Sequence, residues 1–179
     1  MELHTVYISA GSNLGQRLKN CRKGIDMLTH TSGLDSGVGS GPGGADVILT
    51  AQSSFYRTAP VDFTDQDWFV NAVFAIRTRL SPQALLIRLK EIQRRVGRKK
   101  SKIRFGPRVL DLDILLFDDL IISLPDLVIP HPRMHKRRFV LLPICDINPH
   151  LVHPILKREM GDLLGRLNEN EQPVTLIDD

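Results

Sequence analysis

The spacing of apolar residues divides the chain into strands and amphipathic helices. Short runs rich in β-branched and aromatic residues predict strands at 4–10, 46–58, 69–78, 110–117 and, near the end, 174–177. Apolar residues that recur at three- and four-residue spacing predict helices at about 14–29, 82–96 and 156–168.

The helix ends carry residues that suit capping. Ser12 or Asn13 is placed to cap the first helix, and Ser81 to cap the second. Pro82 then occupies the first helical position, where a missing N–H costs nothing, and Gly97 follows the last apolar residue.

The order of the main elements is strand–helix–strand–strand–helix–strand. This order predicts an α+β, ferredoxin-like βαββαβ fold, in which helices pack on one face of an antiparallel sheet and a C-terminal helix follows. We expect one domain over residues 1–179. The glycine-rich stretch 33–44 is interpreted as a flexible insertion within it, because no Gly-Lys-Ser/Thr follows to make a phosphate-binding loop.

Composition agrees with one ordinary globular domain. The chain has 179 residues, of which 42% are hydrophobic and 25% charged. No apolar run approaches the ~18–20 residues of a membrane span, and the N-terminus lacks the layout of a signal peptide. Cys21 and Cys145 stand far apart and outside any metal-binding pattern, so we expect a reduced, cytoplasmic setting.

Positive charge is concentrated in two short segments. One basic cluster lies between Arg94 and Arg108, with no acidic residue, and a second lies between Arg133 and Arg138. Without these clusters the net charge of +4 becomes −8. Such a concentration indicates a polyanionic partner, either a nucleic acid or a small polyphosphate, although a solvated run of charges is the alternative.

The most informative short motif is Asp111-Leu112-Asp113. Residues i and i+2 of a strand point to the same face, so the two carboxylates repel each other unless a cation lies between them. Carboxylates suit Mg²⁺ held jointly with substrate phosphates, and two metal ions could share this pair. Next to a basic loop, the motif favours phosphoryl transfer; an edge strand with two solvated aspartates is the alternative.

Neighbouring residues add possible phosphate contacts. The turn before the strand places Arg108 beside the aspartates, where it could bind a phosphate in bidentate fashion or simply pair with Asp111. His131 and His135 have a spacing that suits zinc only on a helix, and Pro132 lies between them, so a phosphate- or base-contacting histidine near Arg137 fits better.

The segment Arg104-Phe-Gly-Pro-Arg-Val-Leu-Asp-Leu-Asp-Ile-Leu115 resembles the signature of the 6-hydroxymethyl-7,8-dihydropterin pyrophosphokinase family of the folate pathway. Other segments resemble this family in the same order along the chain, so that the resemblance covers about residues 5–150. These segments are Gly11-Ser12-Asn13-Leu14, Ser54 to Thr58, Phe69-Val70-Asn71-Ala72, Pro130-His131-Pro132 and Arg137 to Leu141.

The resemblance implies a ferredoxin-like fold and transfer of pyrophosphate from ATP to the pterin's hydroxymethyl group, with release of AMP. It assigns two Mg²⁺ ions to Asp111 and Asp113, and catalysis to these residues with Arg98 and Arg108. The residues it assigns to ATP are Arg98, Arg108, Ile114, His131 and Arg137. Those it assigns to the pterin are Thr58, Ala59, Val61, Phe69, Asn71, Phe105 and Phe139, with the rings of Phe69 and Phe139 stacking on it.

The sequence departs from the family pattern at a few positions. Gln93 stands where many members carry Glu, Phe105 where a Trp is frequent, and Ala59 where a Pro is common. From the resemblance, the expected partners are ATP and the pterin. No nucleic acid or membrane partner is expected, and a monomer is compatible with the sequence.

An RNA-binding module of the same sheet topology is the alternative function. It would carry exposed aromatic residues in an RNP-like stretch, which the central strands lack. A P-loop NTPase would need the Lys-Ser/Thr pair that is missing after the glycine-rich stretch.

Overall fold

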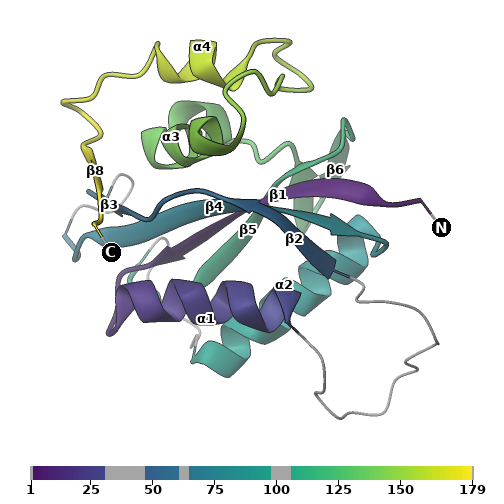
Figure 1. The fold of residues 1–179 in the computed structure, drawn as a ribbon, viewed down its shortest axis with the longest axis horizontal. Coiled ribbons are helices and arrows are strands. Elements are labelled where there is room, and N and C mark those ends of the chain that lie inside the picture. Colours follow the sequence, from purple (N-terminus) through teal and green to yellow (C-terminus); the bar gives the residue numbers. More distant parts are fainter. Residues whose placement is uncertain (1, 31–46, 61–64, 98–105, 179) are drawn as a thin grey trace.

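The computed structural model describes residues 2–30, 47–60, 65–97 and 106–178 (Figure 1). A central sheet has helices on both faces, with α1 and α2 below it and α3 and α4 above it in the view of Figure 1. The glycine-rich stretch 33–44 falls outside the described residues. Within them, no helix is both long and apolar enough to cross a membrane.

The sheet is antiparallel at every pairing, as predicted. Its order is β5-β1-β4-β3-β8, and β2 also pairs with β4. A separate hairpin is formed by β6 and β7. The strands are β1 His4–Ser12, β2 Val47–Gln52, β3 Tyr56–Thr58, β4 Phe69–Thr78, β5 Asp111–Phe117, β6 Ile122–Leu124, β7 Leu127–Ile129 and β8 Val174–Leu176.

The two long helices cover one face of the sheet, as predicted. Helix α2, Pro82–Val96, begins as expected, because the Ser81 hydroxyl accepts a hydrogen bond from Ala84 N at 3.2 Å, and it ends at the left-handed Gly97. Helix α1, Arg17–Thr29, begins later than predicted and has no side-chain cap. The capping role predicted for Ser12 or Asn13 is wrong, because the residue before the helix is Gln16 and the Asn13 side chain is bonded to other loops.

The opposite face is covered by one helix that the apolar spacing did not predict and by a shortened form of one that it did. Helix α3, Arg138–Ile147, contains Pro143, and a 3₁₀ turn, Met134–Lys136, precedes it. The predicted helix 156–168 is reduced to α4, Met160–Leu164. With apolar clusters on both faces of the sheet, β4 is buried at nearly every position, which removes the alternation expected of a half-exposed strand.

The predicted strand 46–58 is divided in two. Strands β2 and β3 both pair with β4, and Ser53 fills the interruption between them. Its backbone N–H donates to Val73 O at 2.9 Å, and its hydroxyl accepts from Val73 N at 3.0 Å. The side chain thus replaces a ladder bond that the break would otherwise leave unmade.

Helix α1 packs closely on the residue that precedes β5. A Cβ added at Gly24 would lie 2.6 Å from Leu110 Cδ2, and Leu110 is fully buried. The absence of a side chain at Gly24 therefore lets the start of β5, which carries Asp111, approach the helix.

We expect Gly24→Ala to lower the free energy of unfolding by about 1–2 kcal/mol, although alanine is the better helix former, because overpacking at Leu110 outweighs helix propensity. Urea unfolding measures the change. Lys23→Ala, at the exposed neighbouring position, is the control and should stay within about 0.5 kcal/mol of the parent. A stabilised Gly24→Ala protein would contradict the close packing.

Candidate active site

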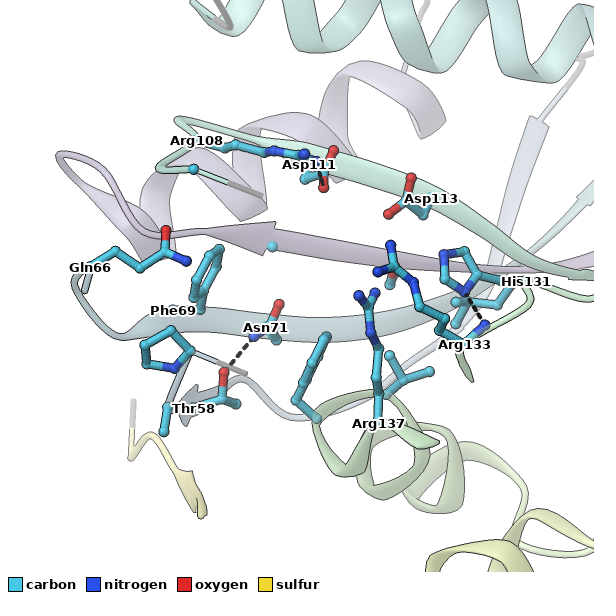
Figure 2. A pocket seen from close by; sticks show the side chains of 18 residues that line it. Thr58, Gln66, Phe69, Asn71, Arg108, Asp111, Asp113, His131, Arg133 and Arg137 are labelled. Carbon is cyan, nitrogen blue, oxygen red and sulfur yellow. Dashed lines mark hydrogen bonds and ion pairs between the residues drawn. The ribbon is translucent and has the colours of Figure 1, made fainter. Parts of the chain in front are cut away.

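Asp111 and Asp113 both line a pocket at the edge of the sheet (Figure 2). They alternate along β5 with the buried Leu112 and Ile114, as the two-residue period of a strand requires. Strand β5 is an edge strand, but its aspartates face this pocket and are only partly exposed, which distinguishes them from solvated edge residues. Two carboxylates therefore lie on one wall of a concave site.

Arginine side chains approach these carboxylates from two directions. Arg108 forms an ion pair with Asp111 through a guanidinium N–H, which is the arrangement considered as the alternative to a phosphate contact. Arg133 and Arg137 extend from the segment around α3 toward the strand of Asp111 and Asp113 (Figure 2). The pocket thus combines a pair of carboxylates with a larger set of cations, which suits a polyphosphate with bound metal.

His131 lies between these groups and is held by its backbone and its ring. Its N–H donates to Leu115 O at 2.9 Å, and its Nδ1 accepts from Arg133 N at 3.2 Å. Burial and, to a smaller extent, the charges of Arg137 and Arg133 lower the pKa of His131 to about 4, against a smaller opposite effect of Asp111. The ring is therefore neutral near pH 7 with its proton on Nε2, where it can donate a hydrogen bond.

The other end of the pocket offers aromatic surface and an amide. Asn71 Nδ2 donates to Thr58 Oγ1 at 2.6 Å, which leaves the direction of the Asn71 amide fixed. Phe69 and Phe139 both line the pocket, and the Arg137 guanidinium lies 5.4 Å from the centre of the Phe139 ring. Such an arrangement suits a flat heterocycle with a polar edge.

Gly11 forms the floor between the two ends of the pocket. It lies in β1 directly opposite Asn71 of β4 and Asp111 of β5. A Cβ at this position would lie 2.6 Å from Asn71 Oδ1. The bare backbone of Gly11 therefore lets the Asn71 side chain occupy its place beside Thr58.

Asn13 joins the loops on either side of the pocket. Its Oδ1 accepts from Arg108 N at 2.7 Å, and its backbone N–H donates to Arg108 O at 3.1 Å. Its Nδ2 donates to Gln66 Oε1 at 2.9 Å. Asn13 is almost fully buried, so these bonds hold the backbone that carries Arg108.

Most of the residues predicted for the site lie together in this pocket. These are Thr58, Ala59, Phe69, Asn71, Arg108, Asp111, Asp113, His131, Arg137 and Phe139. Their individual roles stay predictions. Arg98, Val61 and Phe105 lie outside the described residues.

Ile114 and Gln93 have other surroundings. Ile114 is buried in the apolar cluster on the face of α1 and α2 and is not among the residues that line the pocket. Gln93 is buried in α2, where its Nε2 donates to Leu89 O at 3.2 Å, one turn earlier in the same helix. His135 packs edge-on against His153, with ring centres 6.0 Å apart.

Several pocket residues were not assigned from the sequence. Gly11 is part of the segment Gly11-Ser12-Asn13-Leu14, and Arg133 is part of the second basic cluster. The strand register brings Gly11 to the pocket, and the turn after β7 brings Arg133 there. Gln66 had no sequence signal. The remaining unassigned residues are Ser9, Pro60, Gly106, Leu115 and Val140.

The donor set fits Mg²⁺ held together with a nucleotide. Among the described residues no group of three or more His, Cys, Asp or Glu side chains converges on one point, so a protein-only metal cage is not formed there. Mg²⁺ typically binds one or two carboxylates and takes its remaining ligands from phosphates and water. Asp111 and Asp113, on one face and open to the pocket, supply that number of carboxylates.

Known proteins match the chain over most of its length. A family model for 7,8-dihydro-6-hydroxymethylpterin-pyrophosphokinase (HPPK) matches residues 7–149. The chain is 33% identical over 158 residues to the 2-amino-4-hydroxy-6-hydroxymethyldihydropteridine pyrophosphokinase of Aquifex aeolicus, covering 88% of this chain and 89% of that one. The enzyme of the same name from Bacillus subtilis is 39% identical over 141 residues, covering 79% of this chain and 76% of that one.

A longer relative is the mitochondrial folate synthesis bifunctional protein of Arabidopsis thaliana. It is 42% identical over 144 residues, which are 80% of this chain and 23% of that protein. This chain thus spans less than a quarter of the plant protein but most of the bacterial ones.

Solved structures share the fold. A crystal structure of HPPK-DHPS in complex with substrates matches 92% of this chain and 43% of that chain with a TM-score of 0.66 and 14% identity. Wild-type HPPK-DHPS of Plasmodium falciparum with pteroate gives the same TM-score and identity, over 92% of this chain and 42% of that one. The extent of the family match and the identity to the bacterial enzymes establish that this chain belongs to the 7,8-dihydro-6-hydroxymethylpterin-pyrophosphokinase family.

Proposed function

We propose that this chain transfers pyrophosphate from ATP to the hydroxymethyl group of 6-hydroxymethyl-7,8-dihydropterin in folate synthesis and releases AMP. The observation that carries the proposal is one pocket with a carboxylate pair facing arginines at one end and aromatic rings with a fixed amide at the other. Membership of the family, and the names of the bacterial relatives, support the same reaction.

The charged end of the pocket would hold the triphosphate of ATP. Arg108 and Arg137 would contact phosphate oxygens, and the Nε2–H of neutral His131 would donate to one of them without adding charge. Asp111 and Asp113 would hold two Mg²⁺ ions, which supply neutralisation of the phosphate charge and orientation of the reacting oxygens. Arg108 then exchanges its partner, from Asp111 to the nucleotide.

The aromatic end would hold the pterin. Its flat ring system would stack between Phe69 and Phe139, and its polar edge would meet the Asn71 amide and the backbone near Thr58 and Ala59. Because Asn71 is already bonded to Thr58, its amide is oriented before the substrate arrives. Such preorganisation reduces the entropy lost on binding.

The chemical step needs no nucleophile from the protein. The pterin hydroxyl oxygen forms a bond to the β-phosphorus of ATP, the bond from that phosphorus to the α,β-bridging oxygen breaks, and AMP leaves with the electron pair. The hydroxyl proton passes to solvent. The enhancement of the reaction rate then comes from alignment of the two substrates and from neutralisation of the phosphate charge.

We infer that the described chain acts as one domain. Strands from both ends of the sequence, β1 and β8, belong to the same sheet, and the apolar clusters on its two faces both include residues of β1 and β4. The pocket takes residues from β1, β3, β4, β5 and α3.

Product analysis tests the proposed reaction. The protein mixed with ATP, Mg²⁺ and 6-hydroxymethyl-7,8-dihydropterin should give AMP and the pterin diphosphate, while formation of ADP would exclude pyrophosphoryl transfer. Asp111→Asn or Asp113→Asn should lower kcat at least about 100-fold, because charge stabilisation in the transition state is lost. Asp119→Asn, an exposed aspartate just beyond β5, is the matched control and should keep full activity.

His131 gives a prediction of pH dependence. In the ligand-free protein its ring should titrate near pH 4, well below the ordinary 6.5, because burial and the nearby arginines disfavour the charged form. The unfolded chain takes up this proton first as pH falls, so the contribution of neutral His131 to the free energy of unfolding is complete above about pH 6.5 and is lost toward about pH 4.

NMR of the ring protons measures the titration. Arg137→Gln should raise the pKa of His131, because it removes the larger of the two arginine effects. An inflection for His131 between about pH 6 and 7 in the parent protein would show that the ring is neither buried nor influenced by these charges.

A further inference from the structure

A segment beyond the family match borders the pterin end of the pocket. Residues 169–177, here named the strap, run from the layer of α3 and α4 back to the sheet, where β8 lies beside β3 (Figure 1). The family model ends at residue 149, so the strap lies outside the region it describes. One set of contacts ties the strap to Thr58 and Ala59, which line the pocket, and a second ties it to the start of α3, next to two residues that line the pocket.

The first set fixes the backbone of β3. Thr58 is paired with Val174, and Ala59 N donates to Pro173 O at 3.3 Å. The opposite edge of β3 is already bonded to β4, where Thr58 faces Phe69. With both edges paired, this three-residue strand holds the backbone of Thr58 and Ala59 in place.

The second set fixes the start of α3. Gln172 Oε1 accepts from Arg138 N at 2.8 Å, and Gln172 Nε2 donates to Lys136 O at 3.1 Å. The first N–H groups of a helix have no intrahelical acceptor, and the residue before α3 supplies no side-chain cap. Gln172 therefore acts as the cap of α3 from a distant part of the sequence.

An ion pair strengthens the same attachment. The Arg138 guanidinium pairs with Glu169 of the strap, and the Arg138 side chain is only 10% exposed. Arg138 stands between Arg137 and Phe139, both of which line the pocket. A shift at Arg138 would therefore displace Phe139, one of the two proposed stacking rings, and Arg137, which is one of several proposed phosphate contacts.

We propose that Gln172 is a positioning residue for the pterin, because it ties the start of α3, which carries Phe139, to the strap that pairs with Thr58 and Ala59. This inference rests on the proposed pyrophosphoryl transfer. The strap positions the proposed pterin site in two ways. It pairs with β3, which carries Thr58, and it holds the start of α3, which carries Phe139. The triphosphate depends on it only through Arg137, since Arg108, Asp111 and Asp113 are held by β5 and the loop before it.

Steady-state kinetics of Gln172→Ala test the inference. KM for the pterin should rise about three- to tenfold, the range expected for the loss of one or two hydrogen bonds, while KM for ATP changes less than twofold. Gln172→Glu keeps the acceptor for Arg138 N but loses the donor to Lys136 O, so its KM for the pterin should lie between those of the parent and the alanine variant. The control is Glu171→Ala, at an exposed neighbour whose carboxylate accepts a local hydrogen bond from Asn168 Nδ2.

Hydrogen exchange gives a readout independent of turnover. In Gln172→Ala the Arg138 amide should exchange faster than in the parent and in Glu171→Ala, because it loses its acceptor. An unchanged KM for the pterin, or equal rises in both KM values, would overturn the inference while AMP formation by the parent still supported the proposed function. A parent protein that forms no AMP would instead overturn the proposed function.

Discussion

The crowding of two carboxylates on one face of β5 is the constraint on which the site depends. Asp111 and Asp113 repel each other unless cations lie beside them, and Arg108, Arg133 and Arg137 line the same pocket. The Arg108 guanidinium pairs with the Asp111 carboxylate in the ligand-free protein. A metal-bound triphosphate would place positive charge beside both carboxylates and would give Arg108 a phosphate as its new partner.

The fold supplies the rigid surroundings that this arrangement needs. Strand β1 lies between β4 and β5 and places Gly11 between Asn71 and Asp111, so one residue without a side chain separates the two proposed substrate sites. Asn13, two residues later, fixes the backbone of Arg108 and the side chain of Gln66. The buried Asn13 side chain thereby fixes two loops that are far apart in the sequence relative to each other.

Elements with a strong local signal could be predicted from the sequence. The strand 69–78 and the helix that begins after Ser81 were predicted with their observed bounds, because apolar spacing and a capping hydroxyl are local properties. Helix α3 was not predicted, since Pro143 is a helix breaker and only packing against the sheet compensates for its missing hydrogen bond. Ser12 or Asn13 was expected to cap the first helix, and the actual partners of Asn13 gave no local signal because Arg108 and Gln66 lie far away in the sequence.

The residues of the candidate site also divide into those that could be predicted from the sequence and those that could not. Asp111, Asp113 and Arg108 could be assigned from strand periodicity and charge, and a family resemblance added the pterin end. Gly11 and Gln66 could not be assigned, because they reach the pocket only through strand register and a long-range hydrogen bond. Gln172 could not be assigned either, since its contacts with Lys136 and Arg138 depend on how the strap crosses the molecule.

The dependence of ATP binding on Mg²⁺, measured by calorimetry without the pterin, tests the central role of the carboxylate pair most directly. With Mg²⁺ the parent protein should bind ATP more tightly than a variant that carries both Asp111→Asn and Asp113→Asn. With the metal removed by a chelator, the order should reverse, because the carboxylates then repel the triphosphate and Asp111 occupies Arg108. An equal gain from Mg²⁺ in both proteins would contradict the assignment of the metal to Asp111 and Asp113.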